Sequence, residues 1–537
     1  MQTKHKLLLS LTIPCLIFLG IEATSCGTST STFGEGGIKN DGASDASTGV
    51  KFDGPVLHLG DSSLKDAEAP DAPCSGQLCN QSFTDDCAGK NKPFTSISGV
   101  VYDPAGHLPL YDIYVYVPGA VPDPIDPGNP ACTPCQAPAS GSPIIGTLTN
   151  EQGQFTLTQL TANDYGVPSG ADIPLVIQTG KWRKQITISQ VNACSNTVIA
   201  NPDASVDKLR LPANSSEGDM PLIALTSGCD PAECALLHYG ISQSEFVAPN
   251  APLPVAWQKG VTPITGAGHI RFYTGNDNNT GGPASSVDGG NTVANTYAWW
   301  QSSTNLLQED IIFNACECSP FNRGAIAYQA MDTYLNGGGR LFTTHYYYNW
   351  FEPSPPATAD LFSIANWDLT APLGNQGLVE QDLVDQTFPK GMAFATWLQD
   401  NNITTVLGSI GLGDVRDDVN GVLPANCESD GGTCLATQWI YTTTPIAQLN
   451  VGTRYLSANT PVGSPIANQC GKVTFSDVHV SGKSNDTAFP SECVNPDPTG
   501  IHVVNEEALE FLFFDLSSCV QNEKAPPIMP QPPQPPR

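Results

Sequence analysis

The chain has 537 residues, with 23 Lys plus Arg against 52 Asp plus Glu and a formal net charge of −29. Nucleic-acid binding needs a basic surface that displaces counterions, so this balance argues against a nucleic-acid partner and equally against electrostatic docking on anionic lipid. Acidic excess mainly favours solubility and identifies no partner of its own.

The N-terminus has the pattern of an export signal. Two lysines precede an apolar run over residues 7–21 that is short for a membrane span, and small residues then lead to Cys26. This ending resembles the lipobox of bacterial lipoproteins. The resemblance implies a signal peptide over 1–25, lipidation of Cys26 and anchoring at the outer membrane or cell surface, on the outside or the periplasmic side. The alternative is an ordinary cleaved signal peptide.

The 17 cysteines fit an oxidising compartment. Without Cys15 and Cys26 their number is odd, so at least one thiol is unpaired or bonds another chain. Cysteine spacing leaves the connectivity open, but we expect bridges around the first domain among Cys74, Cys79, Cys87, Cys132 and Cys135, and local pairs Cys229–Cys234, Cys427–Cys434 and Cys470–Cys493. A zinc knuckle at Cys132 and Cys135 lacks the second Cys/His pair that zinc requires.

Residues 26–73 are rich in Gly, Ser, Thr and Asp and predict a flexible tether. A Cys-rich region and a β-sandwich are expected over 74–225. There, "SISGVVYDPAG" and "PLYDIYVYVPG" alternate apolar and polar residues, and Asn150 to Gly153 form a turn between two strands. Short period-two strands separated by Gly, Pro and Asp are typical of an all-β sandwich.

This region resembles the carboxypeptidase regulatory-like domain. The resemblance rests on "SGVVYDPAG" and "TNEQGQF" and covers roughly residues 94–190. It implies an Ig/transthyretin-like sandwich, also grouped with carbohydrate-binding-like folds, which accompanies enzymes. It does not imply a peptidase, because the chain contains no His-x-x-Glu zinc motif.

After a connector over 226–265, the pattern changes to α/β over 266–520. Buried strands are expected at "HIRFYTG", "EDIIFNAC" and "RLFTTHY", with a helix over 324–335 that ends at three glycines. Strand, helix and strand predict a parallel sheet. A late strand, "CGKVTFSDVHV", and a closing helix, "NEEALEFLFFDLSSC", follow, and 521–537 is expected to be a Pro-rich disordered tail.

The order of these elements resembles the class I glutamine amidotransferase-like, flavodoxin-like fold, in its trehalose-utilisation-like branch. That family places a catalytic Cys in a strained elbow after the strand that follows the helix, and a His after a late strand. Here His345 stands at the elbow without the usual glycines, and His479 stands at the late position. Cys316 and Cys318 lie one strand too early for that nucleophile and favour a disulfide or a buried thiol, so glutamine amide hydrolysis is not expected.

His345, His479 and Asp477 are the candidate site residues. If they meet at the carboxyl edge of the sheet, they can bind zinc or another divalent metal, or act as an acid–base pair, with Glu506 or Glu507 completing either arrangement. The alternative is two structural histidines. No other cofactor is expected.

The aromatic run after His345 offers a second kind of contact. Tyr346, Tyr348 and Trp350 are candidate ligand contacts for a glycan, although such a run more often packs a loop onto its domain.

Over nearly its whole mature length the chain resembles a family of Gram-negative surface lipoproteins, on "TGKWRKQITI", "GGGRLFTTHYYYNWF" and "LEFLFFDLSSCV". Members are sometimes filed as tryptophan synthase alpha chain, but no eightfold β/α alternation supports that name. We predict an exported, lipid-anchored binding or structural module without catalysis, whose partner is a glycan or another envelope component. This hypothesis places His345 and His479 apart. The alternative, a metal- or His-dependent hydrolase of a polar substrate such as a carbohydrate, requires both histidines and Asp477 within a few ångströms of one another in one cleft.

Overall fold

The computed structural model describes residues within one compact unit, 72–537. The described residues run from 78 to 530, with gaps at 79–80, 83–84, 160–165, 200–207, 228–229, 248–267, 275–285, 288–290, 293, 296, 318, 352–358, 369–376, 425–433, 446–448, 481–488, 491–492 and 494–499. The predicted signal peptide, Cys26 and the tether therefore lie outside the described residues.

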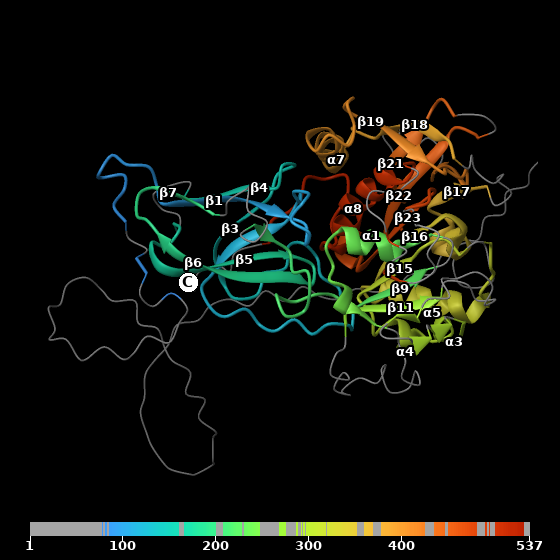
Figure 1. Cartoon of the computed structure of the whole chain (residues 1–537), viewed down its shortest axis with the longest axis horizontal. Helices are drawn as coiled ribbons and strands as arrows, with labels where there is room; N and C mark the ends of the chain where they lie inside the picture. The colour runs from blue at the N-terminus through green and yellow to red at the C-terminus, as the bar shows by residue number, and fades with distance from the viewer. Residues whose placement is uncertain are drawn as a thin grey trace, which may run out of the picture. The chain divides into compact units, whose positions relative to one another are not determined.

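The first described strands form two four-stranded sheets (Figure 1). One has the order β4-β1-β7 with β8 beside β1, and the other has the order β3-β2-β5-β6. Their inner faces share one buried core, to which β4 contributes Phe155 and Leu157 from an alternating pattern. The bounds are β1 Ser96–Tyr102, β2 Tyr114–Pro118, β3 Pro143–Leu148, β4 Gln154–Thr158, β5 Gly170–Thr179, β6 Trp182–Val191, β7 Asn196–Val198 and β8 Leu209–Arg210.

The predicted turn between β3 and β4 is present, but it joins the two sheets instead of making a hairpin. The amide of Gly153 donates to the carbonyl oxygen of Asn150 at 2.9 Å. β3 then pairs with β2, whereas β4 pairs with β1. The period-two pattern identified both strands, but it carried no information about which sheet each strand joins.

An eleven-stranded mixed sheet follows, in the order β10-β11-β9-β15-β16-β23-β22-β21-β18-β19, with β14 beside β11. The strands from β10 to β23 are parallel and those from β22 onward are antiparallel. The bounds are β9 Ile223–Ser227, β10 Phe246–Val247, β11 Ile270–Thr274, β14 Ala294–Asn295, β15 Ile311–Asn314, β16 Arg340–Thr344, β18 Val379–Val384, β19 Ser409–Gly413, β21 Thr437–Thr442, β22 Gly452–Thr460 and β23 Gly471–Ser476. The sequence patterns predicted the parallel strands β11, β15, β16 and β23 but not the antiparallel strands from β22 to β19.

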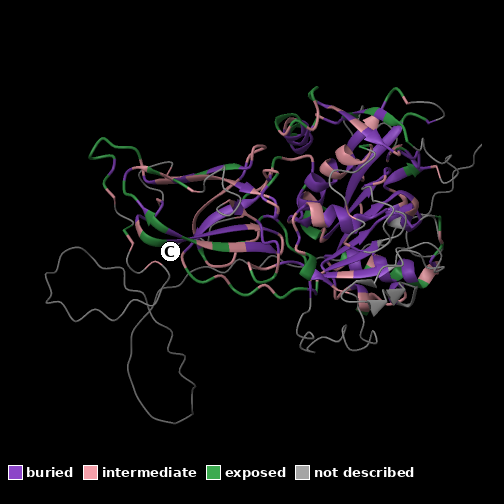
Figure 2. Ribbon diagram, viewed as in Figure 1, coloured by how far each residue is buried: buried purple, intermediate pink, exposed green. Residues whose placement is uncertain are grey.

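Helices cover both faces of this sheet. Its strands are consequently mostly buried and appear purple in Figure 2. α5 (Gly324–Asn336), α3 (Tyr297–Trp300) and α4 (Ser303–Leu306) share a core with Leu341 of β16, whereas the next residue, Phe342, joins the core of the opposite face. That second core includes α1 (Ala232–His238), α7 (Pro389–Asp400) and α8 (Val503–Ser517), and it continues into the β-sandwich. The β-sandwich and the mixed sheet therefore contribute side chains to one continuous hydrophobic core.

The α/β layer begins earlier than its expected start at residue 266. β9 lies between β11 and β15 in the middle of the parallel strands, although the sequence analysis assigned its residues to the end of the sandwich and to the connector. A short apolar run such as "LIALTS" fits either sheet, because length and periodicity do not distinguish two kinds of buried strand.

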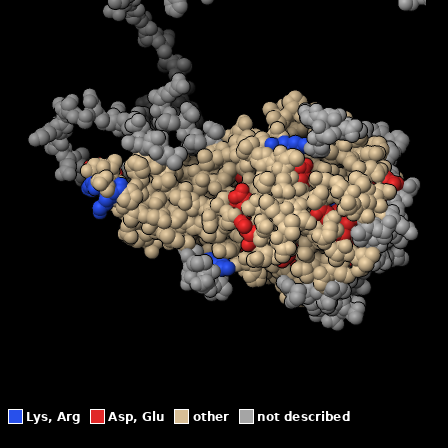
Figure 3. Space-filling model, turned by 90° about the horizontal axis from the view of Figure 1, so that it is seen from above, with Lys and Arg blue, Asp and Glu red and all other residues tan. Residues whose placement is uncertain are grey.

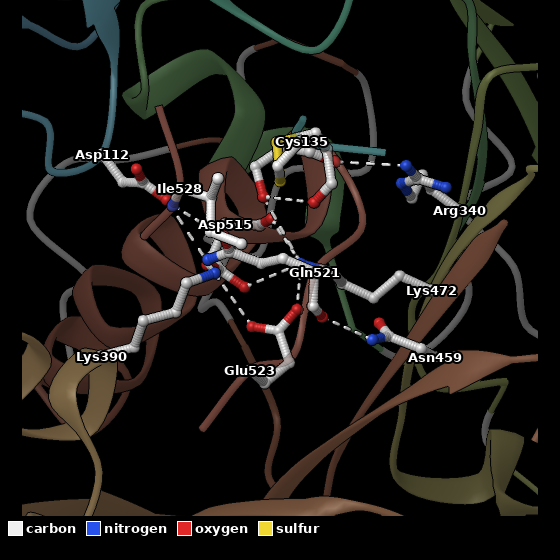
Figure 4. Close-up of a disulfide and its surroundings, with 12 residues drawn as sticks. Asp112, Cys135, Arg340, Lys390, Asn459, Lys472, Asp515, Gln521, Glu523 and Ile528 are labelled. Carbon is white, nitrogen blue, oxygen red and sulfur yellow. Dashed lines mark hydrogen bonds and ion pairs between the residues drawn. A yellow bond between two sulfur atoms is a disulfide. The ribbon is translucent and has the colours of Figure 1, made fainter. Parts of the chain in front are cut away.

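The expectation of a disordered tail from residue 521 is wrong for its first ten residues. Gln521 and Glu523 are 2% and 4% exposed. Glu523 forms ion pairs with Lys390 and Lys472 at 2.9 and 2.7 Å, and the carbonyl oxygen of Gln521 accepts from Asn459 at 2.7 Å (Figure 4). The prolines prevent helix formation in this segment, but the buried ion pairs of Glu523 fix it against the rest of the fold. Residues 531–537 lie outside the described residues.

The disulfides join parts of the chain that are far apart in sequence: Cys87–Cys194, Cys132–Cys470, Cys135–Cys519 and Cys234–Cys493. The expected pairs Cys229–Cys234 and Cys470–Cys493 are therefore wrong. Cys132 and Cys135 bond the α/β layer, not other cysteines of the first domain, because the fold brings their loop against β23 and the end of α8. Cys74, Cys79, Cys229, Cys318 and Cys427 lie outside the described residues. Among the described helices, none has both the length and the apolarity of a membrane span.

Candidate metal centre

Four neighbouring parallel strands end at one edge of the mixed sheet, and a polar side chain follows each of them. Asp230 follows β9, Cys316 follows β15, His345 follows β16 and His479 follows β23. The carboxyl ends of adjacent parallel strands lie side by side. Residues that are far apart in the sequence, such as Asp230 and His479, therefore become neighbours.

Cys316, His345 and His479 form a cluster with the geometry of a metal site. The Sγ atom of Cys316 lies 3.1 Å from Nδ1 of His345, and the two imidazole ring centroids are 4.2 Å apart. One ligand atom from each of the three residues lies within 4.8 Å of the others. The two histidines are therefore close together, which meets one part of the hydrolase alternative; its other part, Asp477 in the same cluster, is not met.

His345 has a backbone conformation that is unusual for a non-glycine residue. Its φ is +51°, in the left-handed region, where a non-glycine residue is destabilised by about 1–3 kcal/mol. The preceding residue helps to hold the turn, because the hydroxyl of Thr344 accepts from the amide of Cys316 at 3.0 Å. The left-handed turn directly after β16 is therefore occupied by a histidine.

Asp230 lies behind His479. It is fully buried, and its Oδ2 is 3.7 Å from Nδ1 of His479 while accepting from the amide of Val480 at 2.9 Å. This separation is longer than a hydrogen bond, so this carboxylate oxygen lies beside the imidazole without a hydrogen bond to Nδ1. On the other side, Asn505 donates to the carbonyl oxygen of His479 at 2.6 Å.

The electrostatics of the cluster favour a neutral His345. Burial lowers its pKa well below the usual value, and the neighbouring charges of His479 and Arg416 lower it further. A neutral imidazole has a lone pair for a metal ion, whereas a protonated imidazole does not.

Asp477 is close in sequence to His479 but belongs to a different network. Its Oδ2 accepts from the amide of Asp418 at 2.8 Å, and Asp418 in turn pairs with Arg416 at 2.8 Å. Burial, and then the charge of Asp418, raise the pKa of Asp477 well above its ordinary value. Among the described residues, the metal-type cluster comprises Cys316 and the two histidines and does not include Asp477.

Glu506 and Glu507 do not complete that cluster either. Glu506 lies 2.5 Å from Nδ1 of His238, in a separate pair on α1 and α8. Burial and the charge of Glu506 raise the pKa of Glu507 to about 7.

The aromatic run after His345 packs mainly into the core. Trp350 is fully buried against Trp300 and Tyr328, with ring centroids 5.2 and 5.6 Å apart, and Tyr348 is 4% exposed. These two side chains present no surface to a ligand in this conformation. Tyr346 is partly buried between His345 and the guanidinium of Arg416, which lies 4.4 Å from its ring centroid.

Comparisons with known proteins add little to this geometry. No family model matches the chain, and no curated protein matches it. Among solved structures, a ThuA-like protein from Bacteroides uniformis is similar at 8% identity and a TM-score of 0.24, over 53% of this chain and 88% of that one. A similarity this low does not establish the family.

Sequence reasoning missed Asp230 and assigned Cys316 a structural role. Asp230 was missed because β9 was not identified as a strand of this sheet. Cys316 was judged one strand too early, although β15 and β16 are parallel neighbours whose ends lie side by side. The available signal was the position common to all four residues, namely a polar side chain one to three residues after a buried strand.

Proposed function

We propose that Cys316, His345 and His479 bind a transition metal, with zinc as the best match, and that the protein is a metal-dependent hydrolase of a polar substrate such as a carbohydrate. The convergence of one sulfur and two imidazoles within 4.8 Å supports this proposal most directly. Thiolate and imidazole are the ligands that zinc prefers, and three protein ligands leave the fourth position for water, as in catalytic zinc sites.

In this proposal the residues have distinct roles. Cys316 would bind as a thiolate, His345 as a neutral imidazole held by its left-handed turn, and His479 as an imidazole with the carboxylate of Asp230 beside it. These three residues would hold the zinc ion, which would supply a water of lowered pKa, and hence hydroxide near neutral pH. His479 is the least buried of the three ligands, so we expect substrate to approach from its side.

We further propose that this site belongs to an exported, lipid-anchored envelope protein. The long-range disulfides and the lack of a membrane-spanning helix among the described residues are compatible with export. The lipobox-like ending at Cys26 supports the anchor, and the order of elements supports a regulatory-like sandwich followed by an amidotransferase-like α/β domain.

Cobalt substitution tests the metal site. Disulfide-intact protein titrated with Co²⁺ is expected to show saturable binding with a thiolate-to-cobalt charge-transfer band. The variants C316S, H345N and H479Q are expected to weaken binding at least tenfold, and C316S to remove the band. H238Q is the matched control, because it removes a histidine that pairs with a carboxylate at similar exposure but away from the cluster.

Turnover by the zinc-loaded protein separates the two functions. Hydrolysis of p-nitrophenyl acetate or p-nitrophenyl glycosides that is lost in H479Q and retained in H238Q supports the hydrolase. Saturable metal binding with no turnover would return the protein to the class of non-catalytic binding modules. Absence of stoichiometric metal binding would overturn the proposal altogether.

A further inference from the structure

A second site of interest lies at the opposite end of the same strands. A cavity of about 250 Å³ is formed where the sandwich, the start of β15 and β16, and the end of α8 meet. Its lining includes Lys181 and Trp182 from the sandwich, Asp310 and Arg340 from the α/β layer, and Cys519 after α8. The cavity is therefore separate from the candidate metal centre, which lies at the carboxyl ends of these strands.

Arg340 is a buried cation bonded only to neutral groups. Its side chain donates to the carbonyl oxygens of Gly338, Cys470 and Ser518 at 2.8, 2.9 and 3.2 Å, near the Cys135 disulfide (Figure 4). No carboxylate forms an ion pair with it within the described part of the chain, and its Nε has no hydrogen-bond partner there. Burial lowers the pKa of Arg340 to about 10, although Tyr334 and the charges of Glu523, Asp310 and Asp515 oppose this shift.

Other buried cations of the protein are compensated. Lys390 and Lys472 each pair with both Asp515 and Glu523, and Arg454 pairs with Glu380 and Asp417. A buried charge is tolerated when a partner offsets its desolvation. Arg340 lies at the wall of a cavity and forms no ion pair among the described residues, so an anion in the cavity would supply the missing counter-charge.

The other polar groups of the wall define the chemistry of that ligand. Lys181 is neutralised by Asp310 at 2.6 Å, and Asp310 also accepts from the amides of Gly128 and Leu222. Trp182 is fully buried, and its Nε1–H has no partner among the described residues. The wall therefore combines one positive charge without an ion-pair partner with partly exposed apolar residues such as Ile125 and Pro130, whereas the indole of Trp182 is itself covered.

We propose that this cavity binds a small organic carboxylate. Arg340 receives the carboxylate, for which a guanidinium is the preferred partner, and the apolar remainder of the ligand lies against Ile125 and Pro130. A volume of about 250 Å³ is just below the usual range for small-molecule pockets, so the ligand is smaller than a typical drug. This inference does not depend on the metal site.

Isothermal titration calorimetry on the disulfide-intact protein tests the inference. Acetate, succinate, citrate and benzoate are titrated at constant ionic strength, with sodium chloride as the reference. We expect saturable binding of at least one carboxylate at one site per chain. Saturable binding of none, or heats equal to those of chloride, means that the cavity holds only water and overturns the inference.

Two variants locate the binding. A131F fills the cavity from an exposed lining residue and is expected to weaken binding at least tenfold, whereas A120F makes the same change on an exposed residue outside the lining and is expected to have no effect. R340M is expected to abolish binding while near-ultraviolet circular dichroism remains native. If R340M does not fold, A131F decides. Unchanged affinity in A131F places the carboxylate elsewhere and contradicts the inference.

Discussion

His345 combines a strained backbone with the position of a ligand. Its φ of +51° would suit glycine or asparagine better, yet the residue is an imidazole in contact with Cys316 and His479. Strain that persists at a cluster of reactive groups is typical of functional sites, because the surrounding structure has to maintain it. The backbone of His345 therefore supports the assignment of the metal centre independently of its side chain.

The strain at His345 leads to a first prediction. Replacing His345 with Asn is expected to weaken cobalt binding at least tenfold while changing the free energy of unfolding by no more than about 1 kcal/mol, because Asn tolerates the left-handed region. Urea denaturation measures the stability. L341A, in the same strand, is the contrast, since truncating a fully buried Leu costs about 2–5 kcal/mol. A loss in H345N as large as in L341A would show that the histidine is retained for packing.

At the scale of elements, the segment 519–530 acts as the closing element of the fold. It follows α8, is bonded to the sandwich through Cys135–Cys519, and places Glu523 between two lysines that have no exposed side-chain surface. One of these lysines, Lys472, lies in β23, the strand that leads to His479. The closing segment thus supports the strand that positions one ligand of the candidate metal centre.

Neutralising Glu523 tests the closing segment. E523Q removes one of two carboxylates from Lys390 and Lys472, and we expect a loss of about 3 kcal/mol, at the lower end for a broken buried pair because Asp515 remains. Glu217 offers a matched control, since it also bridges two cations, Lys184 and Arg210, but is 24% exposed. E217Q is expected to lose less than about 1 kcal/mol. If E523Q and E217Q lose the same free energy of unfolding in chemical denaturation, the ion pairs of Glu523 stabilise the fold no more than a surface ion pair does.

At the scale of the whole molecule, acidic side chains lie both on the surface and in the interior. On the face in Figure 3, the described residues show separate acidic groups amid uncharged residues and no continuous basic patch. Several other carboxyl groups are buried with raised pKa values: burial and then Glu380 raise the pKa of Asp382 to about 8, and burial raises those of Asp112 and Glu309 to about 7.

These buried carboxyl groups predict a molecule that is most stable in mild acid. A group whose pKa is raised on folding contributes stability below its unfolded pKa, near 4, and loses it as the pH rises through the folded value. The free energy of unfolding is therefore expected to fall between about pH 4 and pH 8. Below this range stability falls again, because Lys390 and Lys472, opposing burial, lower the pKa of Asp515 to about 2.

Denaturation midpoints across this pH range test the expectation, and D382N should flatten part of the slope. A stability that rises steadily from mild acid to pH 8 would contradict it.

By itself, the sequence determined the local elements: the period-two strands of the sandwich, the helix before the glycines, and the strands that end at His345 and His479. These follow from periodicity and turn residues, which depend on near neighbours. Only the tertiary structure decided which distant residues meet. It placed Cys316 beside His345 and Asp230 behind His479, directed Asp477 to Arg416 and Asp418, and anchored a proline-rich segment through Glu523. Strand order and long-range charge pairing depend on the packing of the whole sheet, and no local pattern along the chain records them.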